Sequence, residues 1–465
     1  MVTFYKPQKK EVEKKAIKVN CTDLDLQGRG VARDDKYVYF VEGLMPGDSA
    51  NVLISNVKGK IATGKITKII KPSDKRLKKD CALIGTCGGC SLQHIPSDML
   101  IESKVKGIEK LFAKTLPNPL GDPAFVHQGK NTEYRRACRF AIRGDHGKLH
   151  LGFREEKSHN LVKIIDCLCL SERMNNAIEP LNKVINSMKQ KSSLGHVEFL
   201  DSDGALGVLL RMTKTLSDED AALLCEYGKS FNAIISVVEP YKDPMRISKV
   251  ETTRERFIYG SKDDLFISSH GVKLKCKTSS FVQINKEMNE KMIDTVLSML
   301  DVNDSSKIMD LFCGLGNFTM PIAATGAKVV GVDIVSKMIE DARENAKELG
   351  FEKASFEVAD LEELFENQSW AKDNYDAVVL DPGRQGAKRA VLFLAKKKIP
   401  KIVMISCNPL AASRDSLELV KAGYKIKQWG VCDMFPRTSH GEMILEFSLE
   451  DVDRRNSKAL FLYRR

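Results

Sequence analysis

The strongest constraint on the fold lies between residues 278 and 450, where short apolar segments alternate with helical ones. The apolar segments are KIMDLF, AKVVGVDI, ASFEVAD, YDAVVLD, KIVMIS and YKIKQWG. Strands that alternate with helices form parallel sheets, and strands buried on both faces appear as continuous apolar runs. The pattern predicts a parallel, doubly wound α/β domain of Rossmann-like type, to which we assign residues 271–465.

The rest of the chain predicts two further domains, because 465 residues exceed the usual size of one domain. Short strands with glycine turns from Ala16 to Lys71 predict a five-stranded, OB-like β-barrel, which together with a lysine-rich tail occupies residues 1–74. Mixed strands and helices, including a helical stretch at about 97–114, predict an α+β central domain at 75–270. The N-terminus has no apolar signal segment, and no apolar run reaches about 18 residues. We therefore expect a cytoplasmic protein that does not contact membranes.

The net charge of +11 is confined to the first third of the chain. Residues 1–140 contain 26 Lys and Arg against 15 Asp and Glu, whereas the remaining residues contain 47 of each. A basic segment attached to a neutral body predicts a polyanionic partner such as nucleic acid. A solvated basic surface that keeps the protein soluble explains the charge about equally well.

A glycine pair in MDLFCGLGNFT (309–319) stands between a predicted strand and a predicted helix. Gly314 and Gly316 permit positive φ angles and a close approach of the backbone to a ligand. A dinucleotide-binding fold would have a third glycine where Thr319 stands. The pattern therefore favours a cofactor without phosphate over a nicotinamide dinucleotide.

Three aspartates end the predicted strands that follow this turn. Asp333 is placed to accept hydrogen bonds from both ribose hydroxyls, and Asp360 to meet an adenine amino group. Asp381 ends the next strand, in LDPGR. One such aspartate alone is usually a helix cap or a turn residue. Three in order, around a glycine turn, predict a site for S-adenosylmethionine.

A cysteine at the end of the fifth predicted strand suggests the reaction. Cys407, in KIVMISCNP, stands where parallel sheets place their active residues. C5 of a pyrimidine is a poor nucleophile, but addition of a thiolate to C6 makes C5 carbanion-like, and a base must later remove the C5 proton. Glu442 is the first candidate for this base and His440 the second. Taken alone, Cys407 could equally be a buried structural cysteine.

Several segments together resemble the RNA uracil-C5 methyltransferase family over residues 16–448. They are FVQIN (281–285), DLFCGLGNFT, VVGVD, LDPGRQGA, SCNP and DMFPRTSHGE, preceded by GRGVAR, VEGLMPGD and KGKIATGKITKI, which resemble its TRAM domain. The resemblance implies methyl transfer from S-adenosylmethionine to uridine C5 in RNA through a covalent Cys–C6 adduct. The order of the segments follows the 23S ribosomal RNA members. A transfer RNA enzyme, or an RNA-binding factor without activity, is the alternative.

The resemblance also implies roles for individual residues. Cys407 is expected to be the nucleophile and Glu442 the general base. The expected cofactor-binding residues are Gln283, Phe312, Gly314, Asn317, Asp333, Asp360 and Asp381. The family commonly has Glu where Asp333 stands and often has Ala where Gly383 stands, and neither difference removes a functional group.

A cluster of cysteines, CALIGTCGGC (81–90), has the spacing C-x5-C-x2-C. Three thiolates separated by glycines can surround one soft metal centre, whereas zinc sites usually have paired C-x2-C motifs. The resemblance implies a [4Fe-4S] cluster held by Cys81, Cys87 and Cys90. Cys167 is the expected fourth ligand, with Cys169 as a nearby competitor. We expect the cluster to be structural or to orient RNA, since the reaction transfers no electrons.

A basic aromatic segment, NTEYRRACRF (131–140), contains the last predicted site residues. Arginine binds phosphate and stacks on bases, and so does the ring of tyrosine. A basic strand face is the common alternative, but the resemblance favours RNA contact by Tyr134, Arg135, Arg136 and Arg139. The target uridine must leave its stack to expose its ring face to a thiolate. We expect RNA, not DNA, as the partner of a monomeric enzyme.

Overall fold

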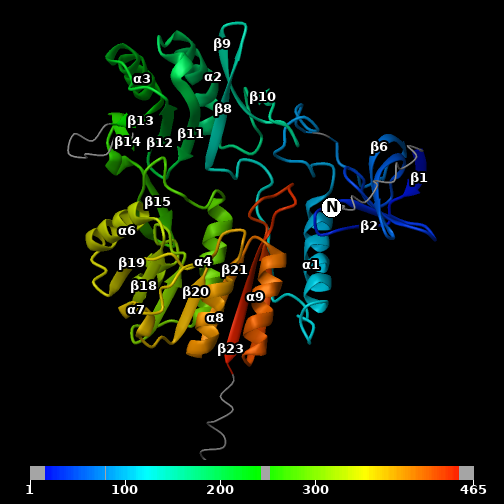
Figure 1. The fold of residues 1–465 in the computed structure, drawn as a ribbon. Coiled ribbons are helices and arrows are strands. Elements are labelled where there is room, and N and C mark those ends of the chain that lie inside the picture. Colours follow the sequence, from blue (N-terminus) through cyan, green and yellow to red (C-terminus); the bar gives the residue numbers. More distant parts are fainter. Residues whose placement is uncertain (1–15, 79, 242–251, 450–465) are drawn as a thin grey trace, which may run out of the picture. The chain divides into compact units, whose positions relative to one another are not determined.

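The computed structural model describes residues 16–78, 80–241 and 252–449 (Figure 1). The predicted lysine-rich tail at 1–15 and the C-terminal extension beyond residue 449 lie outside the described residues. By its internal contacts the chain divides into two compact units. The first contains residues up to 84 together with 90–110 and 437–439, and the second contains 85–89, 111–436 and the chain from 440 onward. The three predicted domain boundaries remain a prediction.

The first unit is built around one six-stranded sheet, ordered β1-β5-β6-β4-β3-β2. Its strands are β1 (Ala16–Asn20), β2 (Asp23–Leu24), β3 (Gly30–Arg33), β4 (Val38–Val41), β5 (Ser49–Lys58) and β6 (Ile61–Lys71). Buried and partly exposed positions alternate in β4 and in the first half of β5, as expected for a sheet with one apolar face. The inward side chains, including Val41, Ala50 and Val52, form its core. The sheet has one strand more than the five predicted. The additional strand, β2, is only two residues long, which is too short to give a periodic sequence pattern.

The second unit begins with a seven-stranded sheet, ordered β10-β9-β8-β11-β12-β13-β14. Its elements are β8 (Ala137–Asp145), β9 (Lys148–Arg154), β10 (Leu161–Lys163), α2 (Glu172–Ser187), η1 (Lys191–Ser193), β11 (Leu194–Asp201), β12 (Leu206–Met212), α3 (Asp218–Phe231), β13 (Ala233–Tyr241) and β14 (Thr252–Tyr259). β12 and β13 are parallel because α3 connects them, whereas the other neighbours are antiparallel. α2 packs against β9 and β11, and α3 against β13 and β14 (Figure 1).

The second sheet of this unit has eight strands in the order β19-β18-β17-β20-β21-β23-β22-β7. The strands are β7 (Phe125–His127), β17 (Lys307–Leu311), β18 (Lys328–Asp333), β19 (Ala354–Val358), β20 (Ala377–Leu380), β21 (Lys401–Ser406), β22 (Tyr424–Cys432) and β23 (Glu442–Leu449). The helices are α4 (Lys286–Leu300), α5 (Thr319–Ala324), α6 (Ser336–Glu348), α7 (Ser369–Lys372), α8 (Lys388–Lys397) and α9 (Pro409–Lys421). The hairpin β15 (Phe266–Ser269) and β16 (Val272–Lys275), preceded by η2 (Lys262–Asp264), and the helix α1 (Ser97–Ala113) complete the described elements.

All six predicted apolar strands are present, but the sheet is not entirely parallel. β19, β18, β17, β20 and β21 run parallel, whereas β23 runs antiparallel to both of its neighbours. The six predicted strands all run in one direction, as predicted, whereas the additional strand β23 is reversed because a short loop without a helix joins it to β22. β7 lies in the Pro- and Gly-rich stretch 117–130. It adds a short strand parallel to β22.

The apolar core of this sheet leaves one edge free for a site. Side chains of α4 and α5, including Met292, Val296 and Ile322, pack with strand residues such as Val379 and Val403. Parallel strands all end at the same edge of such a sheet, and ligands bind outside those ends. Because β23 is antiparallel, its first residue lies at the same edge. No helix among the described residues is both long and apolar enough to cross a membrane.

Candidate active site

The pairing of β21 with β23 brings the two predicted catalytic residues together. Ser406 is paired with Met443, so the residues one step beyond this pair are Cys407 and Glu442. Glu442 is also paired with Cys432 of β22. Its position between two strands explains why only 8% of Glu442 is exposed. The register therefore places a thiol and a carboxyl group beside each other at the free edge of the sheet.

The second candidate base is placed differently. His440 is exposed, and its ring lies edge-on against Phe435 with 5.7 Å between the ring centres. Glu442 is buried beside the thiol, whereas His440 lies two residues earlier, before β23 begins. The geometry favours Glu442 over His440.

Burial and mutual repulsion perturb the acidic groups of this edge. Burial, followed by the charge of Asp381, raises the pKa of Glu442 to about 8, and Arg384 opposes this shift. Burial, followed by the charges of Glu442 and Asp381, raises the pKa of Cys407 to about 11, again against Arg384. The four groups are thus close enough to influence one another electrostatically. At neutral pH the thiol and most of the Glu442 carboxyl groups keep their protons.

Asp381 links this pair to a second predicted residue. Gln283 donates a hydrogen bond from Nε2 to Asp381 Oδ2 at 3.4 Å. Burial raises the pKa of Asp381 to about 7. Two residues before Gln283, the Phe281 side chain is 69% exposed, which is unusual for a large apolar group. Sequence reasoning assigned no role to Phe281, although it stands in the quoted FVQIN motif.

The predicted glycine turn follows β17 directly. Phe312, Gly314 and Gly316 have φ angles of 66°, 54° and 95°, so the backbone turns sharply in the left-handed region. The amides of Phe312 and Cys313 both donate to Val332 O, at 2.8 and 3.1 Å. This tight turn brings bare backbone to the edge of the sheet, as a ligand lying across it requires.

Asp333 is oriented by the same turn. Gly314 N–H donates to Asp333 Oδ2 at 3.0 Å, and Val335 N–H donates to Oδ1 at 2.9 Å. Each carboxylate oxygen can accept a further bond, so Asp333 is held in place yet able to bind two hydroxyl groups. Ile334 and Val335 follow it with 58% and 44% of their surface exposed. The neighbouring exposed apolar side chains suit the face of an adenine ring.

Thr319, which stands in place of a third glycine, has a structural role. Its hydroxyl donates a hydrogen bond to Asp310 Oδ2, and both residues are fully buried. The other oxygen, Asp310 Oδ1, is buried without a hydrogen-bond partner. Burial above all raises the pKa of Asp310 to about 7. Asp310 is an acidic residue that sequence reasoning missed, since its strand position suggested only a core residue.

Asp360 and Asn317 are more occupied than predicted. Asp360 Oδ1 accepts a hydrogen bond from the amide of Glu362 at 2.9 Å, which leaves Oδ2 for a ligand. The amide group of Asn317 forms a reciprocal pair with Asn289 of α4, at 2.9 and 3.0 Å. A ligand that binds the Asn317 side chain must share or break this pair. Together, the residues of this edge fit a nucleoside-bearing cofactor without phosphate.

Of the predicted RNA-binding residues, Tyr134 and Arg136 are buried, each 8% exposed. Arg136 forms an ion pair with Asp203 at 3.0 Å, and its amide donates to Ile284 O at 2.8 Å. Tyr134 and Arg136 therefore have a structural role in the folded protein, whereas the sequence predicted contact with RNA. Arg135 is partly buried, and its Nε donates to Ala137 O at 2.9 Å.

Arg139 keeps an exposed guanidinium group. Its side chain is 56% exposed and pairs with Glu198, with Nε donating to Oε1 at 2.8 Å. Glu198 also binds Arg211, so two arginines share one carboxylate on the sheet surface. Arg139 is the member of the predicted set that remains accessible to RNA.

The predicted metal ligands match a soft metal by their donor atoms, which are four thiols. Cys81 and Cys90 belong to the first unit, and Cys87 and Cys167 to the second. Within the described ranges, no three His, Cys, Asp or Glu side chains are grouped closely enough to hold a metal ion. The thiol of Cys169, with burial, raises the pKa of Cys167, so these two cysteines lie beside each other.

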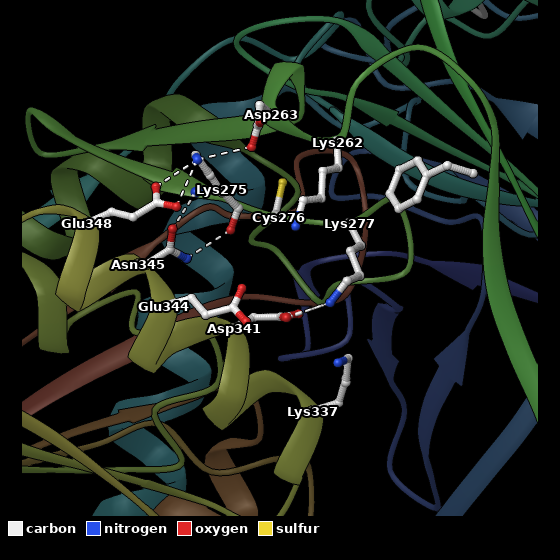
Figure 2. A pocket seen from close by; sticks show the side chains of 11 residues that line it. Lys262, Asp263, Lys275, Cys276, Lys277, Lys337, Asp341, Glu344, Asn345 and Glu348 are labelled. Atoms are coloured by element: carbon white, nitrogen blue, oxygen red, sulfur yellow. Dashed lines mark hydrogen bonds and ion pairs between the residues drawn. The ribbon is translucent and has the colours of Figure 1, made fainter.

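A pocket of about 290 Å³ lies elsewhere in this unit, between β16 and α6 (Figure 2). Its lysines face carboxylates. Lys275 pairs with Asp263 and Glu348, at 3.0 and 2.7 Å, and Lys277 binds Asp341. None of the residues that line this pocket was a predicted site residue. Because its charges neutralise one another, it differs from the open edge around Cys407.

Comparison with known proteins decides the family. A family model described as tRNA (Uracil-5-)-methyltransferase matches residues 97–447, which is more than half of the chain. The chain belongs to the RNA uracil-C5 methyltransferase family. A TRAM domain model matches residues 10–67. The family and the fold class predicted from sequence are confirmed, and this RNA uracil-C5 methyltransferase depends on S-adenosylmethionine.

Two full-length relatives and one solved structure support this assignment. The methyltransferase is 32% identical to the 23S rRNA (uracil(1939)-C(5))-methyltransferase RlmD of Tolumonas auensis, over 96% of this chain and 99% of the relative. It is 34% identical to the enzyme of that name from Shewanella halifaxensis, over 97% and 100%. Its fold matches the Pyrococcus abyssi tRNA (uracil-54, C5)-methyltransferase in complex with S-adenosyl-L-homocysteine, with a TM-score of 0.70, 24% identity and coverage of 93% and 100%.

Proposed function

We propose that this enzyme methylates C5 of a uridine in 23S ribosomal RNA through a covalent bond between Cys407 and C6 of the base. The observation that carries the proposal is the register of β21 and β23, which sets Cys407 beside Glu442 at the open edge of the sheet. A nucleophile and a base side by side are what the two steps of the reaction require.

The cofactor would lie along the same edge. When bound, S-adenosylmethionine supplies a methyl group on a positively charged sulfur. Asp333 would bind the ribose hydroxyls and Asp360 the adenine amino group, while the turn at Gly314 lets the cofactor approach the backbone. Phe312 and Asn317 complete this set as predicted residues at the glycine turn. The orientation of Asp333 by two backbone amides supports its role.

The thiol has to lose its proton before it can add to C6. Because the pKa of Cys407 is about 11, deprotonation of the free thiol at pH 8 costs about 4 kcal/mol, and the thiol is unreactive. The carboxylate of Asp381 would accept the thiol proton as sulfur bonds to C6, which leaves Glu442 without a proton for the second step. The positively charged sulfur of a bound cofactor would lower the pKa of Cys407 and so favour this step. Gln283 holds Asp381 in place for this step.

The adduct then resolves in a second step. C5, now rich in electrons, would take the methyl group while it still carries its hydrogen, and the bond from the methyl group to the cofactor's sulfur would break, with the bonding electrons left on sulfur. Glu442 removes the C5 proton, the C5–C6 double bond re-forms, and the bond from C6 to Cys407 breaks. A pKa of about 8 suits this base, because a base whose pKa lies near the working pH is strong enough and a fraction of it is still deprotonated.

Ribosomal RNA as the substrate rests on the full-length relatives that carry that name. Transfer RNA is the second candidate, favoured by the description of the family model. The deciding experiment maps 5-methyluridine in total RNA from cells with and without the protein. A mark lost from 23S rRNA supports the proposal, whereas a mark lost from tRNA alone supports the second candidate. If 5-methyluridine is lost from neither RNA, both candidate functions are contradicted. That result is expected of an RNA-binding factor without activity.

RNA with 5-fluorouracil at the target position tests the mechanism. Fluorine cannot leave C5 as a proton, so the methylated adduct should persist as a protein–RNA band on a denaturing gel. Mass spectrometry of the digested band should locate the bond at Cys407. An adduct at another cysteine, or methylation of normal RNA without any adduct, would exclude this mechanism.

The enzyme is expected to work as a cytoplasmic monomer.

We also propose that Cys81, Cys87, Cys90 and Cys167 bind the [4Fe-4S] cluster that the sequence resemblance implies. The support is the soft donor set alone, so no step of the reaction depends on the cluster. Iron and acid-labile sulfide should be present in protein purified without oxygen. They should be lost in Cys87→Ser and kept in the matched control Cys225→Ser. Equal iron content in the two variants would exclude Cys87 as a ligand.

A further inference from the structure

A groove of about 470 Å³ lies close to Cys407, which does not itself line it, and has no part in the reaction steps proposed above. Its walls are the loop between β20 and α8 and the first turns of α9. Asn408, the residue after Cys407, lines it, so the groove begins one residue from the nucleophile. Any polymer whose reacting unit reaches Cys407 must pass close to this groove.

The walls of the groove are fixed by hydrogen bonds. Asn408 Nδ2 donates to Arg384 O at 2.8 Å, which ties the loop to the start of α9. Arg414 Nη2 donates to Gln385 O at 2.9 Å. The buried carboxylate of Asp415 accepts from the amide of Ala387 at 2.7 Å. A groove with fixed walls is prepared for a ligand and loses little entropy on binding.

Cations outnumber acidic side chains in the lining of the groove, although the charge of Arg384 also acts on Glu442. Arg384 and Lys388 are exposed, and neither side chain has a hydrogen bond or an ion pair with any described residue. Arg414 is held by Asp415, and Glu362 is the one acidic side chain in the lining. The pocket in Figure 2 is the opposite case, because Lys275 and Lys277 there are bound to carboxylates. The groove beside Cys407 is therefore suited to an anion.

An apolar side chain lies in the same groove. Leu410, on the first turn of α9, is 65% exposed and lines the groove together with the two free cations. A surface with both cations and an exposed apolar group matches a nucleotide, which has an anionic phosphate and an apolar base face.

We infer that this groove binds the nucleotide next to the target uridine, with its phosphate on Arg384 and Lys388 and its base on Leu410. This inference rests on the proposed function and deepens it, because it locates the flanking part of the substrate RNA. When the target uridine leaves the stack, its neighbour loses a stacking partner, and Leu410 would take that place.

The first test measures RNA binding as a function of salt. Each phosphate contact in a single strand adds about 0.7 to the slope of log K against log salt concentration. Lys388→Ala should lower the slope by about that amount. The matched control is Lys396→Ala, an exposed lysine at the other end of α8 with the same change of charge. A wild-type slope in Lys388→Ala, or an equal loss in the control, would overturn the inference.

The second test probes the base. RNA with 2-aminopurine on either side of the target uridine should gain fluorescence at one side when the wild-type enzyme binds, because that base unstacks. Leu410→Ala should lose this signal and raise KM for RNA about fivefold with kcat unchanged. Leu392→Ala, an exposed leucine of α8, is the control. A wild-type signal in Leu410→Ala would refute the contact. If the wild-type enzyme methylates no RNA, the proposed function itself fails. If the wild-type enzyme turns over and Leu410→Ala behaves in the same way, the inference about the groove fails while the proposed function stands.

Discussion

Replacement of Glu442 by Gln tests the coupling between the base and the nucleophile. The change keeps the shape of the side chain and removes its negative charge. The pKa of Cys407 is raised from 9.0 to about 11, with burial as the largest cause and Glu442 next. This shift of about two units corresponds to about 2.7 kcal/mol. Because burial remains, Glu442→Gln should lower the pKa of Cys407 by less than two units.

The effect must depend on pH with a definite sign. The pKa of Glu442 is about 8, so its carboxyl group is neutral below pH 7 and charged above pH 9. Alkylation of Cys407 by iodoacetamide should proceed at equal rates in variant and wild type at pH 6. At pH 9 the variant should react faster, by less than about 100-fold, since it then contains more thiolate. Mass spectrometry of the Cys407 peptide measures these rates.

A matched control and two outcomes complete the test. Glu446→Gln changes a partly buried glutamate of the same strand that binds Gln428, so it should leave the Cys407 rate unchanged. Equal rates at pH 9 in Glu442→Gln, or a difference already present at pH 6, would refute the coupling. In turnover, the variant should accumulate the protein–RNA adduct on normal RNA and lose about 10²- to 10⁴-fold in rate. Full turnover would rule out Glu442 as the base.

Five other substitutions have defined results. Cys407→Ala should abolish turnover and adduct while the Kd for S-adenosylmethionine, measured by calorimetry, stays the same; residual turnover argues against a covalent route. Asp333→Asn should weaken that Kd about tenfold, since hydrogen bonds to a charged acceptor are the stronger ones; an unchanged Kd removes Asp333 from the site. The pKa of Asp310 is raised from 3.8 to about 7, so the folded state binds this proton more tightly, and the resulting stability is present below pH 4 and lost as pH rises through 7. Asp310→Asn should therefore flatten the fall of Tm between pH 5 and 8.5, an effect of up to about 4 kcal/mol, and a parallel fall would disprove the shift. Arg136→Ala should lower Tm by the equivalent of about 3 kcal/mol and Arg139→Ala by less than about 1, because the Arg136 side chain is buried and its removal leaves a cavity, whereas Arg139 is exposed and Glu198 keeps Arg211.

Local sequence patterns were sufficient to predict most elements of the second sheet. Its six predicted strands are short apolar runs that alternate with helical segments, and burial on both faces selects such residues whatever the ligand. β23 was missed because its direction depends on the loop that precedes it, and β7 because three residues carry no periodic signal. The tertiary structure also decided that β23 inserts between β21 and β22.

The candidate site residues were predicted from chemistry that the sequence displays, namely a thiol after a strand, an acid near the end of the chain and acidic strand ends around a glycine turn. Their environment was not. That environment depends on residues far apart in the chain. Examples are the burial of Tyr134 and Arg136, the pairing of Asn317 with Asn289 and the coupling of Cys407 to Glu442. Local composition determines which groups a chain can offer, whereas the packing of distant strands determines which of them are charged, accessible and close enough to react.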